Sequence, residues 1–594
     1  MTINRAHVRL SRIAFLGLIF WGCTKLEDPN QVFGDANMAG AGGSFGTSGN
    51  TGATGNANAG SAAGGLASVG GASGLGAASG AAGALGAAGN GGASAGAGGQ
   101  SCQDPSGFQG LGCYRCAATD ILTLENACTT STCTPFADDK RLTLLGPDGK
   151  LPELPTPVAA SGGSGGVTGA GTGGGSSGGA AGSGVAGSSA AGAGGSASVG
   201  KACADVASKG TVVYITGSSA AKPFLQQIAQ QLVTSGIYIV YTSTGSCIGV
   251  DAVVNGTPMT SGASPAPATS ATYWDSSSSS GVACDLPAAG VAADIGASDV
   301  FAQSCPGFEL TDLDAQQIHD AHGPIQTMTF AVPANSAYFE ISAQAAYFVF
   351  GFGKDGGVRD ASGTVPIWNN ENYLFQRSPS SGTQAMLAEA IGLSATAWLG
   401  KTHKTSDDVA ADIQAAGQNQ DTANLAIGIL AADYIDSKNL RAQIRVLALQ
   451  DSSQTCAMFP DSTSGAHDKR NVRDGHYPVW GPLHLLLKVD QFGNPVNPVN
   501  RQAVTDIVGY LSGTKPLPNG VQLIDVYAQS GLIPECAMHV TRTKDGGNMS
   551  PYQPASPCSC VFEAKATGST TCTPCKVQGD CSAAETCSQG YCEG

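Results

Sequence analysis

An arginine stands shortly before a hydroxyl-rich turn in the stretch "FQRSPSSGTQAMLAEAIGL", residues 375–393. Arg377 is followed by Ser381, Gly382 and Thr383, and an apolar run with helical spacing comes next. A guanidinium presents a planar fork of N–H donors that matches two oxygens of an anion. A helix N-terminus adds free backbone amides, and a glycine permits close backbone approach. These residue types in this order indicate a binding site for an oxyanion.

Two further turns have the same chemistry. Gly217-Ser218-Ser219 and Ser243-Thr244-Gly245-Ser246 each lie between a predicted strand and a predicted helix, and "VAADIGASDV" reads as a short strand ending in Asp299. Serine and threonine are also the preferred N-caps of helices, so a single turn is typical of a cap. Three such turns together with Arg377 and Asp299 favour an anion site. A structural ion pair between Arg377 and Asp299 is the alternative.

An aspartate in an anion site has a physical use. Phosphate still carries a proton at neutral pH, and Asp299 could accept it. Sulfate has no proton to donate and would face an unpaired buried carboxylate, at a cost of several kcal/mol. Asp299 therefore predicts discrimination between the two anions.

The elements that must position these residues are strand–turn–helix units in series. They begin at Thr211, with a β-branched strand at 212–216 and an amphipathic helix from about Pro223, and the layout repeats at 237–256. A further strand around 327–336 precedes a helix-like run at 341–352. Such a series predicts an α/β fold with largely parallel sheets, in which ligands bind beyond the carboxyl ends of strands.

The globular segment resembles the periplasmic phosphate-binding proteins that serve ABC-type phosphate uptake. The resemblance rests on six motifs in order, between about Thr211 and Tyr434: "ITGSSAAKPF", "STGSCIGVDAVV", "DIGASDVF", "PIWNN", "RSPSSGT" and "AIGILAADY". It implies a two-lobed α/β clamshell that binds an anion between its lobes. The ligand-binding residues it implies are Ser219, Ser246, Asp299, Arg377, Ser381, Gly382 and Thr383.

The sequence departs from that family at four positions. Ala220 and Ala221 stand where relatives commonly have hydroxyl residues, Lys222 stands where an aromatic is frequent, and Cys247 replaces a second serine. Alanine in place of a hydroxyl residue removes a hydrogen-bond donor from the first turn. We therefore expect modest affinity for phosphate.

The N-terminus has the pattern of an export signal. Three arginines precede the apolar run "IAFLGLIFWGC", which is too short to span a bilayer as a helix, so residues 1–22 are predicted to be a signal peptide. The ending resembles a bacterial lipobox and makes Cys23 the expected lipidation site. The alternative is an ordinary cleaved signal with an incidental cysteine. The protein is thus expected to be an exported, membrane-anchored lipoprotein of the periplasm or cell surface.

Composition divides the rest of the chain. Glycine accounts for 85 of 594 residues, and two Gly-rich tracts that cannot build a core are predicted to be disordered linkers. The expected order is a lipid-anchored linker (23–101), a cysteine-rich module (102–158), a second linker (159–200), the phosphate-binding-protein-like domain (201–535) and a C-terminal cysteine-rich module (536–594).

The cysteines are expected to form disulfides. Apart from Cys23 there are eighteen, an even number in a chain with an export signal. The run "CYRCAATDILTLENACTTSTC" could instead be written as a zinc ribbon, and we favour disulfides because export is oxidising. One specific pairing, Cys284 with Cys305, is expected to close a serine-rich surface insertion.

Several functions are disfavoured. A net charge of −15 without a basic cluster argues against a nucleic-acid partner. The spacing of His467, His476 and His484 matches no metal motif, and the stretch 473–483 is expected to lead into an edge strand. The globular segment has no Gly-x-Ser-x-Gly turn, which argues against a serine hydrolase. We expect no enzymatic activity, no cofactor and no metal.

Two functions remain. The first is a lipid-anchored solute-binding protein that captures phosphate or a related oxyanion, with an ABC transporter permease as its partner. The second is a surface or adhesive lipoprotein that uses the clamshell as a scaffold without anion transport. Converging donors in one cleft would favour the first, and a cleft filled by side chains such as Lys222 would favour the second.

Overall fold

The computed structural model describes residues 113–114, 118, 120–154, 202–260, 271–276, 280–309, 313 and 315–594. The predicted signal peptide, Cys23 and the two Gly-rich tracts lie outside these residues, as do Cys102 and Cys116. Among the helices of the described part, none is both long and apolar enough to cross a membrane.

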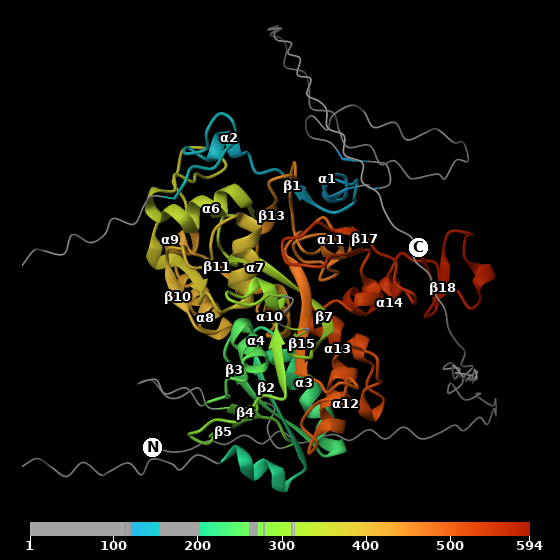
Figure 1. Cartoon of the computed structure of the whole chain (residues 1–594). Coiled ribbons are helices and arrows are strands. Elements are labelled where there is room, and N and C mark those ends of the chain that lie inside the picture. The colour runs from blue at the N-terminus through green and yellow to red at the C-terminus, as the bar shows by residue number, and fades with distance from the viewer. Residues whose placement is uncertain are drawn as a thin grey trace, which may run out of the picture. The chain divides into compact units, whose positions relative to one another are not determined.

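The main sheet has eleven strands (Figure 1). Along the sheet they are β10 (Lys401–His403), β9 (Leu374–Arg377), β11 (Ile427–Ala431), β7 (Ile318–Pro333), β15 (Trp480–Lys488), β6 (Ile295–Ser298), β2 (Thr211–Gly217), β3 (Ile237–Ser243), β4 (Ala271–Tyr273) and β5 (Val282–Cys284), with β12 (Ile444–Val446) beside β7. The predicted α/β class is confirmed.

The first lobe is built on β2, which pairs in parallel with β3 and β6. The β-branched residues Val213 and Ile215 of β2 are completely buried, as an internal strand requires. Its helices are α3 (Lys222–Leu232), α4 (Ser246–Val254), α12 (Arg501–Leu511) and α13 (Leu523–Ser530). The strand and helix expected at 212–216 and from about Pro223 are thus present as β2 and α3.

The second lobe is built on β9, which pairs in parallel with β10 and β11. Its helices are α6 (Ala343–Phe352), α7 (Gly382–Ile391), α8 (Ser406–Ala416), α9 (Gln420–Leu425) and α10 (Ala432–Ser437). Helix α6 is hydrophobic nearly all round and correspondingly buried, which is typical of a helix in the middle of a core.

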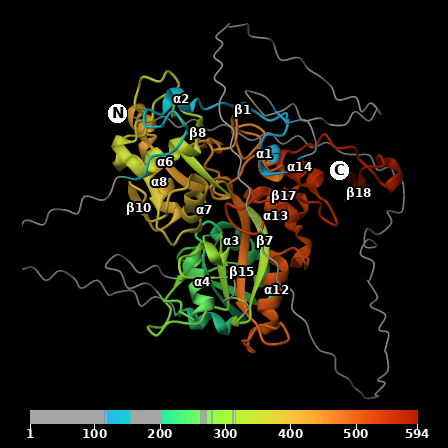
Figure 2. The same cartoon turned by 45° about the horizontal axis from the view of Figure 1, so that its top comes forward.

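Two long antiparallel strands, β7 and β15, connect the lobes (Figures 1 and 2). Residues 318–327 of β7 pair with β15, whereas residues 328–333 pair with β11 and β12. The expectation of largely parallel sheets is therefore correct only for the strands beside β2 and β9. Strands β4 and β5 pair antiparallel, and β6, β11 and β12 pair antiparallel with the two long strands. The expected edge strand is wrong, because β15 lies between β7 and β6 and is almost entirely buried.

The cysteine-rich segment before the first lobe packs against the second lobe. It contains α1 (Ile121–Glu125), β1 (Cys133–Thr134) and α2 (Asp138–Arg141). Strand β1 joins a four-stranded sheet with β14 (Ala457–Met458), β13 (Ala448–Gln450) and β8 (Glu340–Ser342). A disulfide between Cys133 and Cys456, 323 residues apart, links this segment to the globular part.

The C-terminal part contributes short elements. These are α11 (Arg470–Arg473), β16 (Val540–Thr541), β17 (Ser550–Pro551), α14 (Ser559–Thr567), β18 (Thr586–Ser588) and β19 (Tyr591–Glu593). Phe562 of α14 and Cys558 are completely buried in the same core cluster as the second lobe. The final hairpin, β18 with β19, is small and carries a disulfide-bonded cysteine on each strand.

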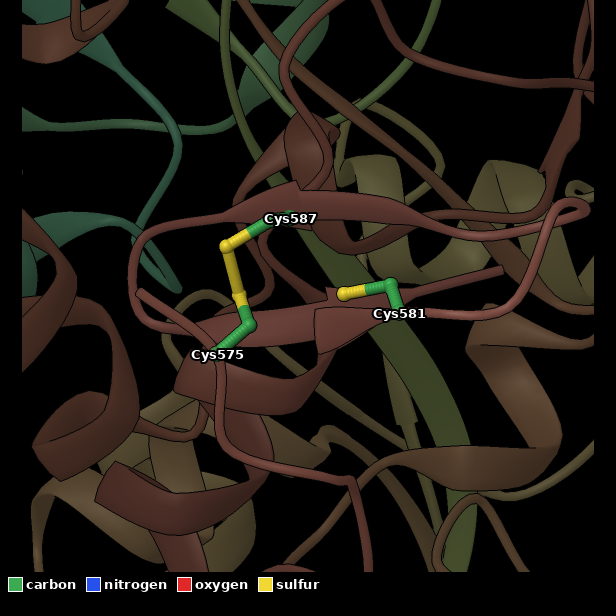
Figure 3. Close-up of side chains that lie close together, drawn as sticks. All are labelled: Cys575, Cys581 and Cys587. Carbon is green, nitrogen blue, oxygen red and sulfur yellow. A yellow bond between two sulfur atoms is a disulfide. The ribbon is translucent and has the colours of Figure 1, made fainter. Parts of the chain in front are cut away.

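The expectation of disulfides is confirmed for the cysteines that the structure describes. The pairs are Cys113–Cys128, Cys133–Cys456, Cys203–Cys284, Cys247–Cys305, Cys536–Cys558, Cys560–Cys572, Cys575–Cys587 and Cys581–Cys592. Figure 3 shows the Cys575–Cys587 bond with the sulfur of Cys581 beside it. The zinc ribbon is excluded, because Cys113, Cys128 and Cys133 are oxidised.

The expected Cys284–Cys305 pair is wrong. Cys284 at the end of β5 bonds to Cys203 ahead of β2, and Cys305 bonds to Cys247 in the first turn of α4. The pairing depends on which segments the sheet brings together, because two cysteines must lie within bonding reach in space.

Candidate functional site

Arg377 is the centre of the candidate site. It is the last residue of β9 and only 1 % exposed. Its Nη1 donates to Ser406 Oγ at 2.8 Å, and its Nη2 donates to Ser219 Oγ at 2.9 Å and to the carbonyl oxygen of Lys404 at 2.8 Å. Ser219 follows β2 of the first lobe, whereas Ser406 begins α8 of the second. Arg377 therefore connects the two lobes.

The charge of Arg377 is incompletely compensated. Its Nε is buried and has no hydrogen-bond partner among the described residues. Burial lowers the pKa of Arg377 to about 10, although the more distant carboxylates of Asp299 and Asp408 act in the opposite direction. The guanidinium remains charged at neutral pH. All three donor contacts go to neutral oxygens, so a buried positive charge lacks a contacting counter-ion.

Asp299 lies directly after β6 and is 2 % exposed. Its Oδ2 accepts from Ser246 Oγ at 3.1 Å, and its backbone N–H donates to the same Oγ at 3.1 Å. Its Oδ1 is buried without a partner among the described residues. Burial raises the pKa of Asp299, while hydrogen bonds from Ser218 and Ser246 and the charge of Arg377 oppose that rise. The alternative, a structural ion pair between Arg377 and Asp299, is not formed by direct contact between the described side chains.

Gly382 brings the N-terminus of α7 against Asp299. A Cβ at this position would lie 2.5 Å from Ser246 Oγ and 2.8 Å from the Cβ of Asp299. Only glycine permits this approach. Ser381 is the N-cap residue of α7 and makes no side-chain cap, and the Oγ1 of buried Thr383 has no partner among the described residues. Gly382 thus meets the Ser246–Asp299 pair of the opposite lobe.

The second turn contacts the same loop. The backbone N–H of Cys247 donates to the carbonyl oxygen of Ser380 at 3.1 Å, and a Cβ at Gly245 would lie 2.9 Å from that oxygen. Helices α4, α7 and α8 begin at residues that carry or adjoin contacts between the turns, and α3 begins three residues after Ser219. The positive ends of helix dipoles and free amides favour a negative charge in such a place.

Three of the residues that differ from the family pattern, Ala220, Ala221 and Cys247, have structural roles. Ala220 and Ala221 are buried, and the N–H of Ala221 donates to Ser218 Oγ at 3.1 Å. The carbonyl oxygen of Ser218 accepts a hydrogen bond from Tyr241. Cys247, in place of a serine, forms a disulfide with Cys305. This turn is therefore held by its own backbone contacts and offers one side-chain hydroxyl, Ser219, to Arg377.

A second buried carboxylate lies in this region and was not predicted. Asp433 of α10 is 3 % exposed, and its Oδ2 accepts from Gln326 Nε2 at 3.4 Å. Burial and then the nearby charge of Asp299 raise the pKa of Asp433 well above its usual range. Asp433 Oδ1, Gln326 Oε1 and Thr327 Oγ1 are buried without partners among the described residues. Asp433 is part of the motif "AIGILAADY". The only sequence signal for a functional role was its position just after a predicted strand.

Ser406 was also missed. It follows Thr405, whose side chain and that of Asp408 form a capping box at the start of α8. A Thr-x-x-Asp pattern was therefore a usable signal for a fourth helix N-terminus. Ser406 Oγ lies 3.2 Å from Ser219 Oγ and so continues the polar contact between lobes.

A hollow of about 310 Å³ opens beside Ser219. It is lined by Ser219, Lys222, Pro223, Gln226, Ser280, Asp407, Tyr434 and Lys438. Two lysines thus flank the solvent side of the lobe junction, and the Tyr434 hydroxyl donates to Asp407. Lys222 lines this hollow.

No family model matches the chain, and no curated protein matches its sequence. Among solved structures it is similar to an ABC-type phosphate transport receptor from Vibrio cholerae, with 12 % identity, TM-score 0.32, and coverage of 54 % of this chain and 99 % of the other. A phosphate-binding protein from Stenotrophomonas maltophilia matches with 12 % identity, TM-score 0.32, and coverage of 55 % and 90 %. The reduced OxyR regulatory domain from Pseudomonas aeruginosa matches with 9 % identity, TM-score 0.27, and coverage of 50 % and 95 %. All three TM-scores are below 0.5.

Proposed function

We propose that this chain is a solute-binding protein that holds phosphate or a related oxyanion between its two lobes. The observation that carries the proposal is Arg377, a buried cation at the lobe junction whose contacts are all to neutral oxygens and whose Nε is unpartnered among the described residues. A buried charge without a counter-ion is costly, and a bound anion would remove that cost.

The surroundings of Arg377 support an anion of tetrahedral shape. Hydroxyls of Ser219, Ser246 and Thr383 and the N-termini of α3, α4, α7 and α8 come from both lobes. An oxyanion with several oxygens can accept from donors on different sides at once. The order of motifs that resembles periplasmic phosphate-binding proteins favours phosphate, with delivery to an ABC transporter permease.

Asp299 supports selection by protonation. Its unpartnered Oδ1 is buried, so the ionised carboxylate needs a proton donor. Monohydrogen and dihydrogen phosphate supply one and sulfate does not. The raised pKa of Asp299 adds a pH dependence: as pH falls, a protonated Asp299 becomes a donor and the penalty against sulfate disappears.

Calorimetric titration tests this proposal. We expect the wild-type chain to bind phosphate with a dissociation constant in the micromolar range, about −8 kcal/mol, and sulfate more weakly. Asp299→Asn should weaken phosphate binding and strengthen sulfate binding, because an amide can donate to an oxygen without hydrogen. Asp251→Asn on α4, where the side chain accepts a hydrogen bond from Asn255, is the matched control and should change neither.

Absence of saturable heat with either anion would contradict the proposal. An unchanged preference in Asp299→Asn would contradict the role of that residue. If neither anion gives saturable heat, the second function is favoured: a surface or adhesive lipoprotein that uses the two lobes as a scaffold.

We also propose that the binding part is tethered to a membrane through Cys23. Cys23→Ser should convert a protein that partitions into detergent into one that stays in the aqueous phase, because Cys23 is the residue that would be acylated. A Gly-rich tether of about 65 to 80 residues would let the folded part range on the order of 50 Å from the bilayer. Unchanged fractionation of the variant would leave only an ordinary secretory signal.

A further inference from the structure

Three side chains of metal-ligand type share one face of the ladder between β7 and β15. Asp320 and His322 are two residues apart on β7, so their side chains point to the same face. His484 of β15 is directly opposite His322, and Leu486 is opposite Asp320. Residues directly opposite in an antiparallel pair also share a face. The register therefore brings Asp320, His322 and His484 together although 162 residues separate the two histidines (484 − 322).

The distances suit a transition-metal ion. His484 Nδ1 lies 2.8 Å from Asp320 Oδ2, and His322 Nε2 lies 3.9 Å from the same oxygen. One ligand atom from each of the three residues lies within 4.8 Å of the other two. Ligands of a tetrahedral zinc ion with bonds of about 2.0–2.1 Å are about 3.3 Å apart. The observed separations bracket that value and need only small side-chain movements.

The site is closed on one side and open on the other. His484 is completely buried, and its Nε2 has no hydrogen-bond partner among the described residues. The ring of Phe301 contacts it edge-on, with centroids 4.4 Å apart. By contrast the side chains of His322 and Asp320 are 42 % and 21 % exposed. A metal ion could enter from solvent on the His322 side.

A hollow of about 330 Å³ on that side is lined by His322 together with Glu535, Arg542 and Tyr552. Glu535 adds a carboxylate near the open position, and the Tyr552 hydroxyl donates to it at 3.3 Å. Three protein ligands with an open fourth position are the usual arrangement of an accessible zinc site.

We propose that Asp320, His322 and His484 bind a divalent transition-metal ion of the zinc class. Two imidazoles and one carboxylate suit zinc, copper or nickel, whereas calcium and magnesium prefer oxygen ligands alone. On binding, the ion takes the place of the proton that His484 Nδ1 shares with Asp320, and the neutral imidazole then carries its one proton on Nε2. The alternative is a hydrogen-bonded Asp–His pair that serves only to fix β7 against β15. This proposal does not depend on the anion site.

The test uses the full chain under non-reducing conditions, stripped with a chelator and dialysed, so that the disulfide-bonded cysteines stay unavailable to metal. Zinc affinity and stoichiometry are measured by competition with a chromophoric chelator, and Co²⁺ is used as a spectroscopic probe of coordination. We expect one zinc ion per chain and a visible Co²⁺ band typical of four-coordination. Zinc should also raise the melting temperature, because it binds only the folded site.

His322→Ala is the main variant, because this side chain is partly exposed and its loss should leave the fold intact. It should weaken zinc binding by about 100-fold or more and abolish the Co²⁺ band, since a direct ligand is lost. Asp320→Asn should act in the same direction. His319→Ala is the matched control, because it removes an exposed histidine from the opposite face of the same strand.

The proposal is overturned if wild type binds zinc no more tightly than His322→Ala. It is equally overturned if His319→Ala weakens binding as much as His322→Ala does. Thermal melts of all variants without metal report whether a loss of affinity comes from a loss of folded protein.

Discussion

Helix α10 contributes a carboxylate to each of two buried charged clusters, Asp433 to one and Asp436 to the other. In the second of these, Lys469 Nζ lies 2.7 Å from Asp436 Oδ2 and 3.0 Å from Asp461 Oδ1, and Arg441 Nη2 lies 2.9 Å from Asp461 Oδ2. Each charge of this paired cluster (Arg441, Asp436, Asp461 and Lys469) contacts an opposite charge. By contrast, Arg377, Asp299 and Asp433 form an unpaired cluster without such contacts.

The pKa directions follow the pairing. Burial disfavours ionisation of Asp436 and Asp461, yet Lys469 and Arg441 hold the pKa of both carboxyls below the usual range. In the unpaired cluster burial prevails and raises the pKa of Asp299 and Asp433. The paired cluster neutralises itself and holds α10 in place. The unpaired one keeps buried charge that a ligand could neutralise, which is a feature of binding sites.

The largest effect is expected from breaking the paired cluster. Lys469→Met removes a completely buried cation and leaves Asp436 and Asp461 with Arg441 alone. Removing one partner of a buried pair typically costs about 3–5 kcal/mol. Urea unfolding measures the loss. Lys438→Met, also at α10 but exposed and 3.6 Å from Asp407, should cost less than about 1 kcal/mol. Similar losses in both variants would show that Lys469 is not structurally special.

Arg377→Met should weaken anion binding more than it lowers the free energy of unfolding. Its charge has no contacting carboxylate, and Ser219 Oγ and Ser406 Oγ already lie 3.2 Å apart, so they can bond to each other without it. We expect the free energy of unfolding in anion-free buffer to change by less than about 2 kcal/mol. Phosphate and sulfate binding should each weaken by about 2–3 kcal/mol, the worth of a charge-assisted contact. A stability loss equal to that of Lys469→Met, with anion binding unchanged, would make Arg377 a structural residue.

The two clusters should give opposite pH dependences. Asp433 has a raised pKa in the folded state, so its contribution to stability is greatest below the ordinary value of 3.8 and is lost as pH rises through the raised pKa. Asp436 has a lowered pKa, so its contribution is present above 3.8 and is lost as pH falls. Relative to wild type, Asp433→Asn should therefore gain stability with rising pH and Asp436→Asn should lose it, by about 1.4 kcal/mol for each unit of pKa shift.

Urea unfolding of the three proteins at several pH values between about 4 and 8 makes this measurement. Parallel profiles for the two variants would show that the clusters do not differ in ionisation.

Glu125 offers a smaller test, because it is buried without an ion pair among the described residues and is not part of the proposed anion site. Burial, and then the charge of Asp451, raises its pKa to about 7, while a hydrogen bond from Ser453 opposes the rise. Stability from this group should be lost as pH rises from its ordinary value of 4.5 to about 7. Glu125→Gln should thus stabilise the chain by on the order of 1–2 kcal/mol at pH 8 and have little effect near pH 4.

Phosphate binding should not change in Glu125→Gln. If it does, a buried carboxyl far along the chain affects anion binding, and the difference between the two clusters cannot be explained by their own contacts alone. Calorimetry on the same samples provides that control.

Sequence reasoning succeeded where the signal was local. The strand and helix around the first turn, the turn before α4 and the Arg377–Thr383 stretch are each encoded within about twenty residues by propensity, turn chemistry and capping. It failed where partners are distant. The signals beside Asp433 and Ser406, a strand end and a helix cap, indicate local structure and do not show that these residues lie near Arg377.

Sequence alone therefore determined the class of the fold, the hydroxyl-rich turns that precede helices, and a cysteine content committed to disulfides. Tertiary structure decided which of these meet. Ser219 bonds Arg377 across 158 residues, Cys133 pairs with Cys456, and the register of β7 with β15 sets His484 opposite His322. The physical reason is the sequence distance over which each interaction acts. Backbone preferences and helix caps act between residues a few positions apart, whereas the pairing of distant charges, thiols and ligands depends on the order of strands in the sheet.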